Sequence, residues 1–190
     1  MIGAALLLAA CGTPSPEAGD STAADTTTWE RTFDNYTDWG VYRGDKKGNQ
    51  YSRLSQITTE NVGELELAWE YNHEDPVGPS MYSNPIVVDG LLYFTTPEVD
   101  AVALDAATGE EVWYFDSSEH TGEDFRGRNR GVTYWEDADG SKGRIYNFVK
   151  DRVYAIDAET GEPVESFGEN GYINLRENLP IPADSASVEV

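Results

Sequence analysis

The chain has 190 residues, of which 39% are hydrophobic and 12% aromatic, which is enough apolar material for a folded core and too much for a disordered protein. Asp and Glu number 35 against 13 Lys and Arg, so the formal net charge is −22 at pH 7. That charge argues against nucleic acid or an anionic lipid surface as a partner, because both would be repelled.

The first eleven residues resemble a bacterial lipoprotein signal. An apolar run beginning at Met1 ends in Leu-Ala-Ala and then Cys11. In such signals small residues fit the peptidase before the cleavage point and the cysteine thiol is acylated. A transmembrane helix is the alternative, but the run is about half as long as a bilayer span requires. We therefore expect residues 1–11 to be a signal peptide with Cys11 as the lipidated residue.

This signal also predicts a location. The protein would be exported and held by its lipid on the periplasmic side of a bacterial membrane. Gly12 stands where signals for inner-membrane retention usually have Asp, so the outer membrane is slightly favoured. Residues 12–28 are almost all Gly, Ser, Thr, Ala, Pro and acids, which cannot bury a core, and they predict a flexible tether.

An internal repeat decides the expected architecture of residues 29–190. The motif Asp-Ala-x-Thr-Gly occurs at 105–109 and returns at 157–161, about 50 residues later. Asp and Thr side chains can cap backbone N–H groups while Gly adopts the positive φ of a tight turn. Both copies follow apolar, β-rich runs and precede a third run, at 111–115 in the first copy and 163–167 in the second.

These patterns predict an all-β protein, because no segment has the length or spacing of a helix. Residues 65, 67 and 69 alternate as a strand would, and Trp113 matches the tryptophan that packs between blades in tryptophan-docked propellers. A repeat of this size cannot bury both of its faces alone, so it must stack on neighbours. A partial β-propeller of two to three blades fits best, and a β-sandwich is the alternative.

Three ordered stretches resemble the PQQ-dependent (quinoprotein) alcohol and glucose dehydrogenases, where PQQ is pyrroloquinoline quinone. They are residues 39–69, residues 84–93 leading into the first repeat, and residues 129–135 leading into the second repeat and on to Leu175. The resemblance implies an eight-bladed propeller, of which this chain would be an N-terminal fragment. It also implies PQQ as cofactor, an alcohol or aldose as substrate, and a cytochrome c or ubiquinone as electron acceptor.

In this family an Asn-Arg-Gly segment delivers an arginine to PQQ, and here that segment begins at Asn129. The resemblance therefore implies that Asn129 and Arg130 bind the cofactor, and a guanidinium suits the carboxylates of PQQ. A structural arginine at a blade edge is the alternative. Tyr82 stands where some relatives have a cofactor-binding acid, and it is either a further contact or a packed tyrosine. Asp124 and Phe125 replace two adjacent cysteines of many members, so their disulfide is absent, and Phe125 is a candidate to cover the quinone.

The family mechanism needs groups that this chain does not supply. A carboxylate base takes the hydroxyl proton while hydride passes to the quinone, whose carbonyl is polarised by calcium. The resemblance places the base and the calcium ligands beyond Val190, so no residue here is assigned a catalytic or metal-binding role. His73 and His120 have no partner at metal-ligand spacing, and both are expected at the surface.

Two other functions use the same repeats. A propeller lipoprotein that binds no quinone and serves as a scaffold in outer-membrane assembly would keep the turn motif and the tryptophan but would not need a central arginine. A solute-binding propeller without redox chemistry is the third reading. The segment Asn129 to Gly131 favours the enzyme.

Overall fold

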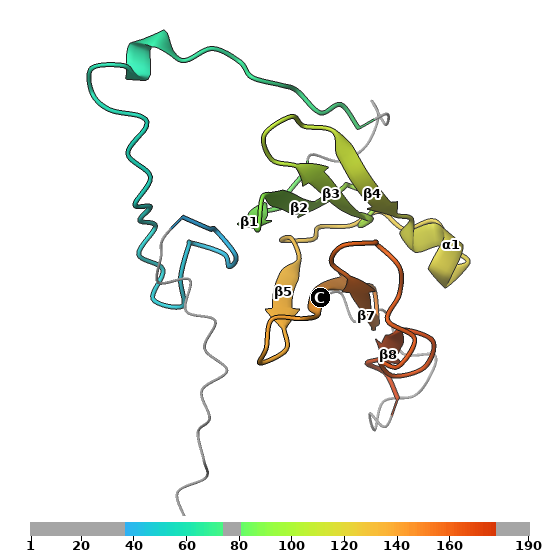
Figure 1. Ribbon diagram of the computed structural model, residues 1–190. Helices are drawn as coiled ribbons and strands as arrows, with labels where there is room; N and C mark the ends of the chain where they lie inside the picture. The colour runs from blue at the N-terminus through green and yellow to red at the C-terminus, as the bar shows by residue number, and fades with distance from the viewer. Residues whose placement is uncertain (1–36, 74–80, 178–190) are drawn as a thin grey trace, which may run out of the picture.

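Two antiparallel sheets of four strands each form the folded part of the chain in a computed structural model that describes residues 37–73 and 81–177 (Figure 1). The first sheet has the order β1-β2-β3-β4, and its strands are Ile86–Val88, Leu91–Thr95, Ala101–Asp105 and Glu111–Phe115. The second has the order β5-β6-β7-β8, and its strands are Thr133–Glu136, Gly143–Val149, Arg152–Asp157 and Tyr172–Asn174. The all-β class and the partial propeller are confirmed.

Several predictions fall outside the described residues. The signal peptide at 1–11 with Cys11, the tether at 12–28 and the ends of the folded region at 29–36 and 178–190 all lie there. Among the described residues, no helix has the length and hydrophobicity needed to cross a bilayer.

The repeated turn has the predicted chemistry in both sheets. The Oδ1 atom of Asp105 accepts hydrogen bonds from the backbone N–H groups of Ala107 and Thr108 at 2.9 and 2.8 Å, and from the Thr108 hydroxyl at 3.1 Å. Asp157 repeats the pattern with distances of 3.0, 3.0 and 3.1 Å. These bonds favour the charged carboxylate, and they lower the pKa of Asp105. In both sheets, the turn after the third strand, β3 or β7, is therefore closed by hydrogen bonds within the motif itself.

The two sheets face each other across one apolar core. The first sheet contributes residues including Ile86, Tyr93 and Phe115, and the second contributes Ile145 and Ile156, all at most 3% exposed. The opposite face of the first sheet holds a smaller cluster, which is Phe94, Val102 and Leu104 with Trp69, Tyr71 and Leu92 packed against it. The first sheet is therefore covered on both faces, as a blade between neighbours must be.

A tryptophan joins each sheet to the element before it. The indole N–H of Trp113 on β4 donates to the carbonyl of Ala158 at 2.9 Å, and its ring lies on Gly161, where a Cβ would come within 2.8 Å of the ring. Trp69 repeats this contact with the first sheet, donating to Ala106 at 3.2 Å and lying on Gly109. The predicted interblade role of Trp113 is confirmed. Trp69 is a second residue of the same kind.

Two predicted strands are wrong. Residues 163–167 form no strand, because Pro163 has no N–H for a ladder and makes only an isolated bridge to Ile156, so Tyr172–Asn174 completes the second sheet instead. The segment from Leu65 to Trp69 also forms no strand in the described residues. The side chains of Leu65 and Leu67 are 59% and 80% exposed there, and only Trp69 is anchored.

The structure also adds helical turns that the sequence did not predict. Residues Val62–Glu64 form a 3₁₀ turn, η1, and Ser117–Thr121 form the short helix α1. Asp116 caps α1 by accepting from the N–H groups of Ser118 and Glu119, and Gly122 ends it with a φ of 75°. Elements this short carry no readable helical period, which is why the pattern missed them.

Candidate functional site

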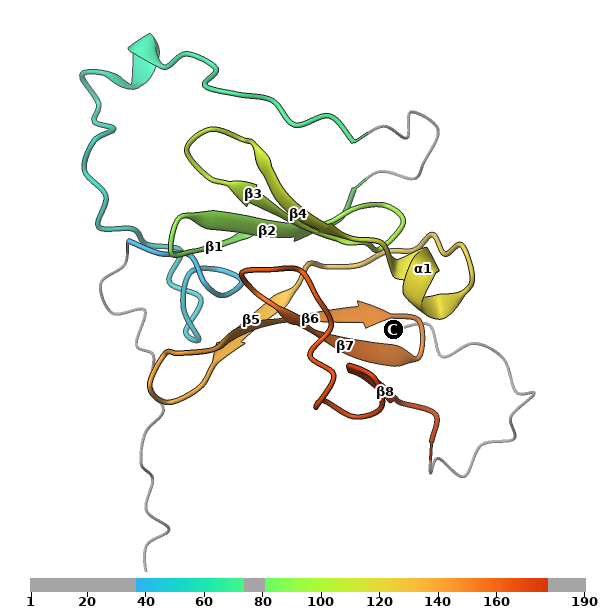
Figure 2. The same cartoon turned by 45° about the vertical axis from the view of Figure 1, so that its right-hand side comes forward.

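An arginine-rich loop, residues 126–131, leads into β5 and lies beside the residues that precede β1. The connection from α1 to β5 runs between the two sheets in Figure 2. The backbone N–H and the side-chain amide of Asn84 both donate to the carbonyl of Arg130, each at 3.0 Å. These bonds bring the starts of β1 and β5 together, although they are far apart in the sequence.

Asn129 fixes the loop through its side chain. Its amide N–H₂ donates to Asn147 Oδ1 at 3.1 Å and to the Phe148 carbonyl at 3.0 Å, while its Oδ1 accepts from the Gly131 N–H at 2.8 Å. Asn129 therefore uses its donors and its acceptor within the protein. Its observed role is to position the loop, and a direct contact between Asn129 and the cofactor stays a prediction.

Asn147 links Asn129 to the loop between β2 and β3 of the first sheet. Asn147 on β6 is fully buried and donates to the carbonyl of Val99 at 2.7 Å. Val99 has a φ of 69°, which is unusual for a β-branched residue and turns its carbonyl toward Asn147. The loop between β2 and β3 is thus tied through Asn147 to Asn129, and both sheets contribute to the position of the arginine loop.

Gly131 allows the close approach of these two segments. Its φ is 114°, and a Cβ at this position would lie 2.6 Å from the carbonyl oxygen of Asn84. Any larger residue would combine an unfavourable backbone conformation with this clash. The glycine of the Asn-Arg-Gly segment is therefore required by geometry.

The three arginines of the loop have different surroundings. Arg126 forms an ion pair with Glu98 at 3.1 Å. The guanidinium carbon of Arg128 lies 5.3 Å from the ring centroid of Tyr82, which is 42% exposed. The exposed guanidinium of Arg130 makes no hydrogen bond or ion pair with any residue in 37–73 or 81–177. The structure thus brings the predicted residues Asn129, Arg130 and Tyr82 together, and Arg130 is available for an anion.

Phe125, the residue expected to cover a quinone, is partly buried against the core. Its ring contacts the core between the sheets, and the ammonium of Lys150 lies 5.3 Å from its centroid. Gly127 passes close beside the same ring. This position gives Phe125 a packing role, and its expected place over a quinone stays a prediction.

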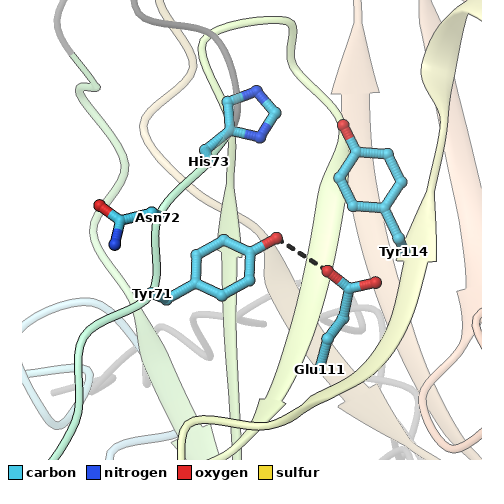
Figure 3. A pocket seen from close by; sticks show the side chains of 5 residues that line it. All are labelled: Tyr71, Asn72, His73, Glu111 and Tyr114. Atoms are coloured by element: carbon cyan, nitrogen blue, oxygen red, sulfur yellow. Dashed lines mark hydrogen bonds between the residues drawn. The ribbon is translucent and has the colours of Figure 1, made fainter.

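A separate pocket of about 340 Å³ lies on the other face of the first sheet, lined by Tyr71, Asn72, His73, Glu111 and Tyr114 (Figure 3). Tyr71 donates to Glu111 at 2.8 Å, and Tyr114 donates to the buried Asp100 at 2.5 Å. Burial raises the pKa of Tyr114, and the bond to Asp100 raises it further, so this phenol remains a neutral donor.

Both histidines lie away from any metal-binding arrangement. His73 is half-buried, and its Nε2 lies 2.7 Å from Glu98, so its expected surface position is only partly right. His120 is exposed and stacks on Phe115 with ring centroids 4.3 Å apart. Across the two described ranges, no group of three or more His, Cys, Asp or Glu could hold a metal ion.

The comparison with protein families now identifies this arrangement. The PQQ family model, described as the β-propeller domain of glucose, ethanol and alcohol dehydrogenases, matches residues 39–189. The chain belongs to this family. The PQQ-dependent dehydrogenase resemblance expected from the sequence is confirmed.

Two curated relatives show the extent of the match. The chain is 35% identical over 160 residues to the quinoprotein glucose dehydrogenase of Escherichia coli, covering 75% of this chain and 20% of that protein. It is 37% identical over 132 residues to the quinohemoprotein alcohol dehydrogenase of Comamonas testosteroni, covering 67% of this chain and 18% of that protein. The chain therefore spans about a fifth of the length of these PQQ-dependent relatives.

Solved structures agree with the fold. The quinohemoprotein alcohol dehydrogenase of Pseudomonas putida matches with a TM-score of 0.58 and 30% identity, over 77% of this chain and 20% of that one. The enzyme of Comamonas testosteroni matches with a TM-score of 0.57 and 31% identity, over 76% and 20%. The two sheets described above are thus blades of a PQQ-dependent dehydrogenase propeller.

The arginine loop has the chemistry that PQQ requires. PQQ carries three carboxylates, and an arginine pairs with a carboxylate through two parallel hydrogen bonds. Arg130 has a guanidinium without an acidic partner among the described residues, in a protein of net charge −22. The backbone around it is fixed by Asn84 and Asn129. The residues present fit the cofactor, and direct contact by Arg130, Asn129 or Tyr82 remains a prediction.

Sequence reasoning missed two members of this site. Asn147 could have been found as the one strongly polar residue of β6 between Ile145 and Val149, at a position that alternation places on the same face as both. Arg128 could have been found from the alternation of arginines at 126, 128 and 130.

Proposed function

We propose that the protein containing this chain oxidises an alcohol or an aldose with PQQ as its cofactor. Its curated relatives are named as quinoprotein or quinohemoprotein dehydrogenases of glucose and alcohols. The observation in this chain that carries the proposal is Arg130, an exposed guanidinium without an acidic partner in the described residues, on a loop fixed by both sheets.

The residues of this chain would bind and orient the cofactor. Arg130 would hold a carboxylate of PQQ, and bidentate pairing would set the direction of that group. The bonds from Asn84 and to Asn129 hold the loop before the ligand arrives, which lowers the entropy lost on binding. Tyr82 would present its phenol beside the same ligand. When bound, PQQ supplies the quinone that accepts hydride from the substrate.

Other parts of the reaction belong to groups outside the described site. The proposal includes a calcium ion beside PQQ, since a hard cation suits oxygen ligands, and a carboxylate that takes the substrate's hydroxyl proton. Neither role is assigned to a residue of this chain. The electrons would pass on to a cytochrome or a quinone. We further propose that the protein is exported and anchored by a lipid on Cys11, at the periplasmic side of a bacterial membrane.

The test is a PQQ titration of the full-length protein, with and without the Arg130→Ala substitution. Quenching of tryptophan fluorescence reports the binding. Hydrogen bonds to charged groups are worth about 1.5 to 3 kcal/mol, so the substitution is expected to weaken PQQ affinity by roughly tenfold to a hundredfold. Because Arg130 is exposed and without a partner in the described residues, the melting temperature should change little.

A matched control is Arg144→Ala. Arg144 lies at the opposite end of β6 from the residues that bind Asn129, and its guanidinium carbon is 5.1 Å from the ring centroid of Trp135. This variant loses the same charge and should keep its PQQ affinity. If the wild-type protein binds no PQQ, the proposed function is wrong, and a non-enzymatic propeller becomes the better account.

A further inference from the structure

The arginine loop contains a second cation that the family resemblance does not assign. Arg128 lies two residues before Arg130, and like Arg130 it forms no ion pair with a carboxylate within 37–73 and 81–177. Two residues of chain span at most about 7 Å, so the two arginines start from neighbouring points of the backbone. Their guanidinium groups can therefore reach different acidic groups of one ligand.

Two neighbouring positive charges distinguish this loop in a protein of net charge −22. Arg126 in the same loop pairs with Glu98. Arg144, like Arg128, lies over an aromatic ring and forms no ion pair in the described parts of the chain, so a missing carboxylate partner is not by itself a signal. What is particular to Arg128 is Arg130 two residues away, since two guanidinium groups without a carboxylate among the described residues favour an anion at this position.

Contact with Tyr82 orients Arg128. The guanidinium carbon lies 5.3 Å from the Tyr82 ring centroid, within the range of a cation–π contact. Tyr82 itself is held two residues before Asn84, whose N–H groups bind the carbonyl of Arg130. The contact between Tyr82 and Arg128 therefore joins the same two segments as the hydrogen bonds between Asn84 and Arg130. A cation–π contact uses no N–H donor in a hydrogen bond, so the donors of Arg128 are left for a carboxylate.

We propose that Arg128, supported by Tyr82, is a second cofactor-binding residue that pairs with another carboxylate of PQQ than the one held by Arg130. This inference rests on the proposed function, because it needs a ligand with more than one acidic group. It explains why the loop places arginines at both 128 and 130, although either alone could bind a single carboxylate.

The experiment measures PQQ affinity of the full-length protein by fluorescence titration for wild type, Arg128→Gln, Arg128→Lys and the control Arg144→Gln. Arg128→Gln is expected to weaken binding by about tenfold or more, because a charge-assisted bond is lost. Arg128→Lys keeps the charge but loses the planar fork, so its affinity should fall between wild type and Arg128→Gln. Arg144→Gln should bind like wild type.

A second readout separates binding from structure. Raising the salt concentration should weaken PQQ binding less in Arg128→Gln than in wild type, because one screened charge pair is missing. The melting temperatures should agree, since Arg128 is exposed. If wild type binds PQQ and Arg128→Gln binds it equally well, this inference is wrong while the proposed function stands. If wild type binds no PQQ, both are wrong.

Discussion

Replacing Asn147 by alanine tests whether the buried amides hold the arginine loop in place. Asn147 is fully buried, donates to the Val99 carbonyl at 2.7 Å and accepts from Asn129 at 3.1 Å. Each lost hydrogen bond costs about 0.5 to 1.5 kcal/mol, and a buried carbonyl left without a donor adds about 1 to 3 kcal/mol. We expect Asn147→Ala to lower the free energy of unfolding by about 2 to 6 kcal/mol.

A second variant separates the two bonds. Asn147→Asp keeps an acceptor for Asn129 but places a carboxylate against the Val99 carbonyl, so it should destabilise the protein more than Asn147→Ala. The assay is denaturant unfolding of the full-length protein, with PQQ titration of both variants. Exposed Asn72, which has no hydrogen bond among the described residues, provides the control, and Asn72→Ala should stay within about 0.5 kcal/mol of wild type. A change of that small size in Asn147→Ala would refute the positioning role.

Three further predictions concern the glycine, the tryptophan and the helix cap. Gly131→Ala should cost about 2 kcal/mol or more because its Cβ would meet the Asn84 carbonyl at 2.6 Å, whereas Gly140→Ala, with φ of 71° and open space, should cost only about 1 kcal/mol in the same unfolding assay. Trp113→Phe removes the bond to Ala158 and should lower the free energy of unfolding by about 1 to 3 kcal/mol, and an unchanged value would contradict tryptophan docking. Hydrogen bonds from Ser118 lower the pKa of Asp116, so its contribution is present above its usual pKa of 3.8 and is lost as pH falls through the lowered value. The difference in unfolding free energy between wild type and Asp116→Asn should therefore be below about 1 kcal/mol at about pH 7 and shrink further in acid, and a difference that grows in acid would be the wrong sign.

The repeat predicted most of the fold because its signals are local. The bonds of Asp105 and Asp157 to their own turns depend only on residues within three positions, so the motif fixes the hairpin wherever it stands. The position of Trp113 could also be predicted, since it lies in the β-rich run that follows the turn. The predicted strand at 163–167 was wrong because this run of the second repeat starts with Pro163, which cannot donate to a strand ladder. Residues 172–174, further along the chain, pair with β7 as the fourth strand instead.

The candidate site was only partly predictable for the opposite reason. The Asn-Arg-Gly segment pointed to Arg130, but the contacts that hold it come from Asn84 and Asn147, which lie 46 and 18 residues from their partners in this loop. Periodicity cannot show which carbonyl a buried amide will reach. Asn129 illustrates this limit, because the sequence pointed to a cofactor contact, which stays a prediction, and did not show that its amide also binds Phe148 and Gly131.

The most direct test of the central claim is an experimental structure of the full-length protein with PQQ bound. The account predicts the guanidinium of Arg130 within about 3 Å of a PQQ carboxylate, with the Asn84 and Asn129 bonds unchanged. PQQ bound elsewhere, or an Arg130 side chain turned away from the cofactor, would contradict the assignment of this loop as the cofactor site.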